Sequence, residues 1–271
     1  MHIALKPKSK LLRKYIIHYN NLLHEDTKDL NYFVFPNTGC TLVFNQGISV
    51  VNSEYASYAT ANKDEGNNIL LMGKYTTPVF LSFSGFINQL SINFHPNGIN
   101  HFFDKPYKVM APNNFQIISS DGFEAFYKDV YSTSNYNERV DIADDFFERR
   151  LRNLENDYLY KAIDLLHDAE VISIEQIARQ CNVSNRTLRR TFNLYLGCSP
   201  RSFKKIIRFR NAIERRFYTN SNNFTALAHD ANFYDSSHFA REFKALTNQT
   251  PSEFFKTITE VSDFKFPFKF V

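Results

Sequence analysis

The spacing of apolar residues differs between the two halves of the chain. Between residues 31 and 95, short runs rich in β-branched and aromatic residues are separated by Pro, Gly and Asn, as expected for strands joined by turns. These runs predict six strands, at residues 32–35, 41–44, 48–51, 69–72, 79–83 and 89–94. Strands of this length and number predict a compact β-sandwich or barrel.

A helical period follows the predicted strands. Val140, Ala143, Phe147 and Leu151 lie on one face of a predicted amphipathic helix over residues 140–154. This apolar face either pairs two protomers or packs against the chain's own barrel. The 28 Phe and 15 Tyr likewise leave two alternatives open, an apolar ligand pocket or an ordinary core.

The C-terminal part contains an internal repeat with an offset of 50 residues before a predicted turn and 51 after it. Two copies are too few for a solenoid, and the extra residue falls in the second copy's turn, near Tyr234. The first copy matches the second at Ala178, Asn182, Leu188, Arg190, Phe192, Gly197 and Pro200, paired with Ala228, Asn232, Phe239, Arg241, Phe243, Asn248 and Pro251.

Each copy predicts two helices joined by a tight turn. In the first copy, Ser173 and Gln176 have the spacing of a capping box, and Asn182 suits the left-handed conformation that ends a helix. Ser184 can cap a second helix that Gly197 ends. In the second copy, residues 224–231 predict the first helix and Asp235 caps the next. This is helix-turn-helix geometry, with the second helix free to enter a groove.

Polar and basic residues lie on the outward face of each second helix. They are Arg186, Arg189 and Arg190 in the first copy, and Ser236, Ser237, His238 and Arg241 in the second. A helix over residues 158–168 is predicted beneath the first copy, and a long basic helix over residues 201–218 is predicted to join the two copies.

Charge is distributed unevenly along the chain. Residues 1–156 hold 15 Lys+Arg and 16 Asp+Glu, a net charge of −1, whereas residues 157–271 hold 17 and 12, a net charge of +5. Residues 179–216 alone contain eleven basic residues and one acid, Glu214. Such density attracts polyanions, although a basic stretch in an arbitrary protein is more often a solvated helix face.

Other classes of protein find little support. The longest apolar runs fall far short of the roughly 20 residues that span a bilayer, and no secretory signal is recognisable, so we expect a cytoplasmic protein with no membrane partner. Cys40, Cys181 and Cys198 form no C-x-x-C pair. His95 has only His101 nearby, which favours a structural role over a metal site. No catalytic motif appears, so we expect no catalytic residue, metal or cofactor.

The motifs of the repeat resemble those of the AraC/XylS family of transcriptional regulators. The first helix-turn-helix carries I-A-R-Q-C-N-V-S-N-R-T-L-R-R-T-F and G-C-S-P, and the second carries N-F-Y-D-S-S-H-F-A-R-E-F-K followed by T-P-S-E-F. The resemblance covers roughly residues 157–257. The sequence departs from the family at Asn182, Asn232 and Asn248, where Gly is common, and Asn is the usual alternative at such φ angles.

The resemblance implies an α+β multidomain protein. Its N-terminal β-sandwich or barrel, residues 1–155, is similar in layout to a cupin-like sensor and dimerisation domain. An all-α double helix-turn-helix domain would occupy residues 156–260, with units at 157–200 and 222–257 and a linking helix at 201–218. The two recognition helices would enter major-groove segments one helical turn apart.

The resemblance also implies the partners and the contacting residues. The partners are double-stranded promoter DNA, RNA polymerase if the protein is an activator, and an unknown effector, with pairing to a second copy of the chain left open. A sequence-indifferent nucleic-acid protein and an enzyme with a catalytic β domain are the competing hypotheses. The residues expected to contact DNA are Arg186, Arg189, Arg190, Ser236, Ser237, His238 and Arg241, with Thr187, Lys204, Lys205 and Arg208 mainly on phosphates.

Overall fold

The computed structural model describes residues 2–64, 66–168, 173–219, 223–260 and 267–271. Its contacts divide the chain into two units, each of which is described by itself. None of the described helices is long and apolar enough to span a membrane. The first unit comprises Met1–Tyr32, Gly39–Gly73 and Phe80–Leu154, and the second comprises Phe33–Thr38, Lys74–Val79 and Glu155–Val271.

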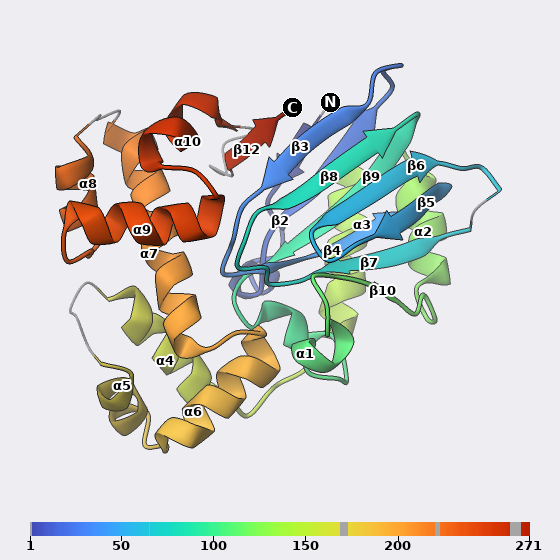
Figure 1. Ribbon diagram of the computed structural model, residues 1–271. Helices are drawn as coiled ribbons and strands as arrows, with labels where there is room; N and C mark the ends of the chain where they lie inside the picture. Colours follow the sequence, from blue (N-terminus) through green and yellow to red (C-terminus); the bar gives the residue numbers. More distant parts are fainter. Residues whose placement is uncertain (1, 65, 169–172, 220–222, 261–266) are drawn as a thin grey trace. The chain divides into compact units, whose positions relative to one another are not determined.

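The first unit contains a six-stranded antiparallel sheet (Figure 1) in the order β1-β2-β9-β4-β7-β10. Its central pairs place Thr41 of β4 opposite Asn93 of β9 and Met72 of β7. The strands are β1 His2–Leu5, β2 Ile16–His24, β4 Cys40–Asn45, β7 Asn68–Met72, β9 Ile87–Phe94 and β10 Phe115–Ile118.

A second sheet contains the remaining strands of this unit in the order β3-β8-β6-β5. Strands β5 and β6 are antiparallel, whereas β6 and β8 run parallel. All six predicted strands form, which confirms the β-rich N-terminal part of the predicted fold class. The strands of this sheet are β3 Leu30–Val34, β5 Ile48–Asn52, β6 Ala56–Ala61 and β8 Val79–Ser84.

Strands β1, β2, β6 and β10 were not predicted, and β2 shows why. Its sequence, IIHYNNLLH, includes the buried polar residues His18 and Asn21, so apolar and polar positions do not alternate. Burial, and then the nearby charges of His2 and His95, lower the pKa of His18 to about 3. A buried neutral imidazole of this kind belongs to a strand interior that hydropathy alone does not reveal.

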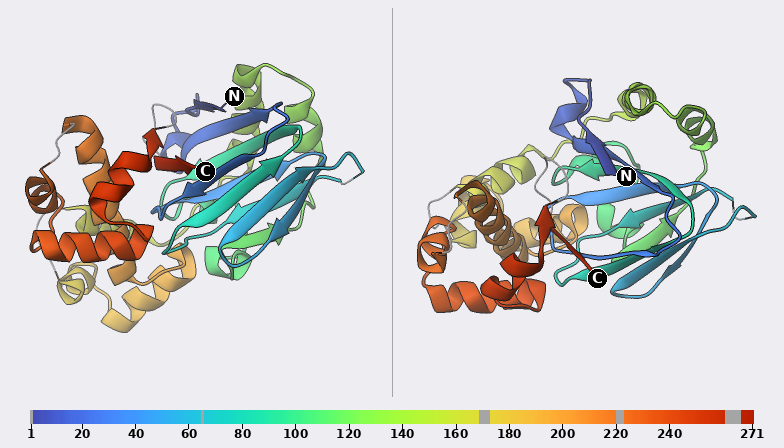
Figure 2. Two further views of the ribbon diagram at one scale, coloured as in Figure 1. Left: turned by 45° about the horizontal axis from the view of Figure 1, so that its top comes forward. Right: turned by 90° about the horizontal axis from the view of Figure 1, so that it is seen from above.

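Helices α2 (Glu124–Tyr131) and α3 (Tyr136–Arg150) cover the outer face of the first sheet (Figure 2). Val140, Ala143 and Phe147 of α3 are buried in the core that this sheet forms with the helices. Of the two alternatives for the amphipathic helix, the structure therefore supports packing against its own sheet. Short helical segments complete the unit at η1 Leu12–Lys14, η2 Gly98–His101 and α1 Tyr107–Met110.

The predicted bounds of this helix, 140–154, were wrong. Asn135 caps α3 by accepting a hydrogen bond from the Asn137 backbone N–H, so the helix begins before the apolar stripe does. It ends at Arg150, because Leu151 has an extended backbone. Phe44 packs against Phe126 in the same core, with ring centroids 4.8 Å apart, as expected if the aromatic residues form an ordinary core.

Close packing at Gly39 gives a test of the first unit. A Cβ atom at Gly39 would lie 2.0 Å from the backbone oxygen of Phe94, whereas one at Gly66 would meet nothing within 4 Å. We expect Gly39→Ala to lower the free energy of unfolding by about 2–3 kcal/mol because the backbone must shift. Gly66→Ala is the matched control and should stay within about 0.5 kcal/mol of the parent. Urea unfolding measures both, and equal stabilities of the two variants would contradict this packing.

Candidate nucleic-acid interface

The second of the two contact-defined units contains seven helices within the described ranges. Four of them form two helix-turn-helix motifs, which we call the first and the second helix-turn-helix (Figure 1). Helices α5 and α6 form the first, helices α8 and α9 form the second, and α7 links them. Residue 222, where the second helix-turn-helix was predicted to begin, lies outside the described residues. The helices are α4 Asp157–His167, α5 Ile174–Gln180, α6 Asn185–Thr191, α7 Pro200–Thr219, α8 Phe224–Asp230, α9 Ser236–Thr247 and α10 Pro251–Thr257.

The predicted capping signals of the first helix-turn-helix are present. The Ser173 hydroxyl accepts from the Gln176 backbone N–H at 3.2 Å, and the Gln176 side chain accepts from the Ser173 backbone N–H at 2.7 Å. Ser184 caps α6 by accepting from the Thr187 backbone N–H. A π-helical turn, Phe192–Leu196, extends α6 to Gly197, which ends it with a φ of 70°.

A Schellman motif ends α5 and sets the direction in which the chain leaves it. Asn182 has a φ of 54°, and its backbone N–H donates to the Arg179 carbonyl at 3.0 Å. The next N–H, of Val183, donates to the Ala178 carbonyl at 3.0 Å. Both bonds use carbonyls that the helix leaves unpaired at its end. The chain can therefore turn sharply into α6 without leaving buried polar groups unsatisfied.

The second helix-turn-helix repeats the Schellman motif at the end of α8. Asn232 has a φ of 60° and donates to the His229 carbonyl, while Phe233 donates to the Ala228 carbonyl. One further residue, Tyr234, is then accommodated in the turn with its side chain 91% exposed. Asp235 caps α9 by accepting from the His238 backbone N–H at 2.6 Å.

One face of each recognition helix, α6 and α9, is buried, and this fixes which residues face outward. Leu188 and Phe192 lie in the core of the first helix-turn-helix. Phe239 and Phe243 lie in the core of the second helix-turn-helix. The small residues Ala178 and Ala228 are buried in the same two cores, which allows α5 and α8 to approach these helices closely.

The predicted contact residues of α6 lie mainly on its exposed side. Arg186, Arg189 and Arg190 are all exposed, and within the described part of the chain none of them forms an ion pair. Thr187 is half-buried, with its hydroxyl 2.9 Å from the Ser184 hydroxyl. The three guanidinium groups are thus available to an external partner, whereas Thr187 is already engaged in the helix cap.

The predicted contact residues of α9 divide in the same way. Ser236, Ser237 and Arg241 are exposed. His238 is half-buried, with its ring against Phe233 and its Nε2 atom 3.2 Å from Glu242 Oε1. His238 is therefore held by neighbours on its own unit, unlike the two serines before it.

Glu242 gathers three of the predicted contact residues and was not itself predicted. It accepts from Arg208 at 2.6 Å and lies 3.4 Å from the Lys205 ammonium, in addition to its contact with His238. Glu242 is 11% exposed and Arg208 17% exposed, so this ion pair is largely shielded from solvent. No local signal in the sequence identifies the contact, because Arg208 and Glu242 lie 34 residues apart.

Lys204, like Lys205 and Arg208, is a predicted contact residue of α7. Burial, and then repulsion from Arg208, lowers the pKa of Lys204. Arg201 is exposed and precedes Lys204 by three residues, so both lie on the same face of α7. This spacing could have been read from the sequence.

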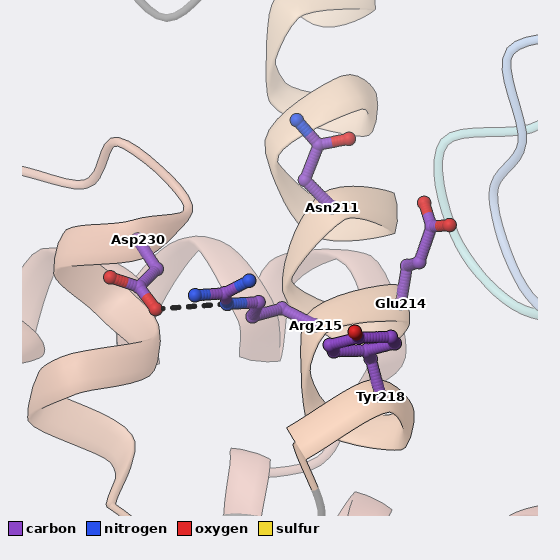
Figure 3. A pocket seen from close by; sticks show the side chains of 5 residues that line it. All are labelled: Asn211, Glu214, Arg215, Tyr218 and Asp230. Atoms are coloured by element: carbon purple, nitrogen blue, oxygen red, sulfur yellow. Dashed lines mark hydrogen bonds and ion pairs between the residues drawn. The ribbon is translucent and has the colours of Figure 1, made fainter.

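A separate hollow of about 560 Å³ lies between α7 and α8 (Figure 3). The Arg215 Nε atom donates to Asp230 across it at 3.0 Å, and Tyr218 is 77% exposed beside them. Asn211 and Glu214 complete the lining. Charges of both signs line this hollow, so it favours no anion, and none of its residues was predicted to contact DNA.

Two family models match the chain. A helix-turn-helix domain matches residues 177–257, which include both units described above. A domain of unknown function, DUF6597, matches residues 5–116 in the β-rich unit. Comparison with curated protein sequences gives no match.

Three solved structures illustrate what the chain is similar to. ToxT from Vibrio cholerae O395 is 15% identical and covers 92% of this chain and 100% of its own, with a TM-score of 0.48. A regulator with an AraC-type DNA-binding domain from Chromobacterium violaceum is 27% identical over 36% of this chain and 88% of its own, with a TM-score of 0.33. A probable AraC family regulator from Rhodopseudomonas palustris CGA009 is 24% identical over 36% and 94%, also at 0.33.

The left-handed residue of the first turn can be tested by substitution. We expect Asn182→Val to lower the free energy of unfolding by about 1–2 kcal/mol, because a β-branched residue is strained at positive φ. Asn182→Gly is the matched control, since glycine adopts this conformation without strain and should preserve stability. Thermal unfolding followed by circular dichroism measures the difference. Two variants of equal stability would show that the turn tolerates another conformation.

Proposed function

We propose that this chain is a transcriptional regulator of the AraC/XylS type and recognises promoter DNA with both helix-turn-helix units at once, a proposal that the match to a helix-turn-helix domain over residues 177–257 supports. The observation that carries the proposal is the pairing of two capped recognition helices, each with its apolar face buried and its polar edge exposed. The exposed edges hold guanidinium groups on α6 and two hydroxyls with a guanidinium on α9. These groups suit the major groove, where each base pair displays a distinct set of donors and acceptors.

The residues divide by the kind of contact we propose for them. Arg186, Arg189, Arg190 and Arg241 can each pair with guanine O6 and N7, and Ser236 and Ser237 can bond to a base edge or a phosphate. Thr187 and His238, which are engaged with neighbouring residues, serve backbone contact or positioning. Lys204, Lys205 and Arg208 supply positive charge toward phosphates, which contributes affinity but little selectivity.

The β-rich unit is proposed to be the sensor. We assign residues 1–155 to effector binding and dimerisation, and residues 156–260 to DNA binding. Promoter regulation further implies that an activating complex contacts RNA polymerase and that the protein acts in the cytoplasm, on the nucleoid. The proposed activity is binding and not catalysis, in keeping with the family.

Selection of duplexes from a random pool tests this function. We expect two segments of base preference about 10 base pairs apart, one for each recognition helix. We also expect selected duplexes to bind at least about 10³-fold more tightly than random ones at the same salt concentration. Equal affinity for all duplexes would instead favour a sequence-indifferent nucleic-acid protein.

Arg190 offers a test at a single residue. Arg190→Ala should weaken binding to the selected duplex by about 1–3 kcal/mol and relax the preference at one base pair, because a bidentate contact with guanine is lost. Arg149→Ala is the matched control, since Arg149 is an exposed arginine of α3 in the other unit. Competition binding with single-base variants of the duplex measures both effects. An unchanged preference profile would remove Arg190 from the base-reading set.

A further inference from the structure

A concave basic surface lies between α5 and the first half of α7. Its hollow of about 330 Å³ is lined by Glu175 of α5 and by four cationic side chains that share one face of α7. We refer to it as the α7 hollow. The four cations are Arg201, Lys204, Lys205 and Arg208.

The α7 hollow adjoins the first turns of both recognition helices. At one end, Asn185, the first residue of α6, donates from its side chain to Glu175 at 3.3 Å. At the other end, Arg208 binds Glu242, which lies one helical turn beyond His238 on α9. Residues in the first turns of a recognition helix are those that reach base edges. The hollow therefore lies between the two places at which the chain would meet the grooves.

The balance of charge in and beside the hollow favours an anion. Four cations face the carboxylates of Glu175 and Glu242, which leaves two positive charges in excess. Hydrogen bonds from its own backbone N–H and from Ser173 lower the pKa of Glu175, so its carboxylate is ionised. Burial, and then the neighbouring charge of Arg208, lowers the pKa of Lys204, so both disfavour its charged form. A bound anion would relieve the repulsion between Lys204 and Arg208.

We propose that the α7 hollow seats a backbone phosphate of the duplex between the two major-groove segments, with Arg201 and Lys204 as its direct ligands. Glu242 is a positioning residue that holds Lys205 and Arg208 beside them. This inference rests on the proposed function, because it places both recognition helices on one face of a single duplex. Two major-groove segments one turn apart flank a minor groove, whose bordering phosphates face a protein that bridges it.

The seat predicts coupling between two cations and one phosphate. In the full chain, the double variant Arg201→Ala, Lys204→Ala should reduce the slope of log K against log salt concentration by about 0.9, since one phosphate contact is lost. Duplexes carrying one neutral methylphosphonate at successive positions between the two segments complete the test. At one position the parent should lose about tenfold in affinity, while the double variant loses nothing further.

Two further variants serve as controls. Lys256→Ala removes an exposed lysine of α10, outside the hollow, and should leave the coupling intact. Lys204→Arg keeps the charge and should keep most of the affinity. Circular dichroism verifies that each variant folds as the parent does.

Several outcomes would overturn the seat. An unchanged salt slope in the double variant would do so. So would losses of affinity from the double variant and from the methylphosphonate that are additive at every position of the duplex. Saturable binding of inorganic phosphate by the DNA-free chain, with duplex affinity unchanged in the double variant, would assign the hollow to a free phosphorylated ligand instead. A parent that binds all duplexes equally would contradict the proposed function. In that case the salt slopes of the parent and the double variant on an arbitrary duplex would still test the phosphate seat.

Discussion

The DNA-binding unit depends on one backbone constraint, the left-handed residue that ends each supporting helix. Asn182 and Asn232 adopt φ angles of 54° and 60°, and in both turns two N–H groups return to carbonyls of the helix just completed. This arrangement lets the chain reverse over few residues while its polar groups stay bonded. The direction of each recognition helix follows from it, and so does the choice of which side chains are buried. A different backbone conformation at this turn would rotate the polar edge of the recognition helix as a whole. A change of rotamer in one arginine could not compensate for that rotation.

Helix α7 does more than separate the two units. Its apolar side contributes Phe203 and Ile207 to the first core and Phe209 and Ile213 to the second. Its polar side carries the cations that Glu242 draws toward α9. One helix thus shares both hydrophobic cores, because burial on opposite ends of a 20-residue helix ties two small domains together. The shielded carboxylate adds a polar tie at the same junction, where loss of Glu242 would leave neighbouring cations facing one another.

Local signals in the sequence were sufficient for the features that local physics decides. The capping box of α5, the left-handed asparagines and the buried faces of α6 and α9 follow from residue type and spacing, and all are present. Strand β2 was missed because His18 and Asn21 occupy buried positions that a hydropathy pattern assigns to the surface. The partners of Arg208 and His238 were missed for a different reason, since Glu242 meets them only through the tertiary fold. Arg201 was overlooked although its place on the basic face of α7 can be read from spacing alone.

The two recognition helices present unlike chemistry, and the second turn is one residue longer than the first. Tyr234, the added residue, stands almost fully exposed beside the start of α9, with no counterpart beside α6. A palindromic operator mirrors a protein two-fold axis, and a single chain with these two unequal heads has none. Under the proposed function, such a chain would bind its operator in one orientation only, so a bound monomer would have an upstream end and a downstream end. The polarity of a transcription start site could then be matched without a second protomer.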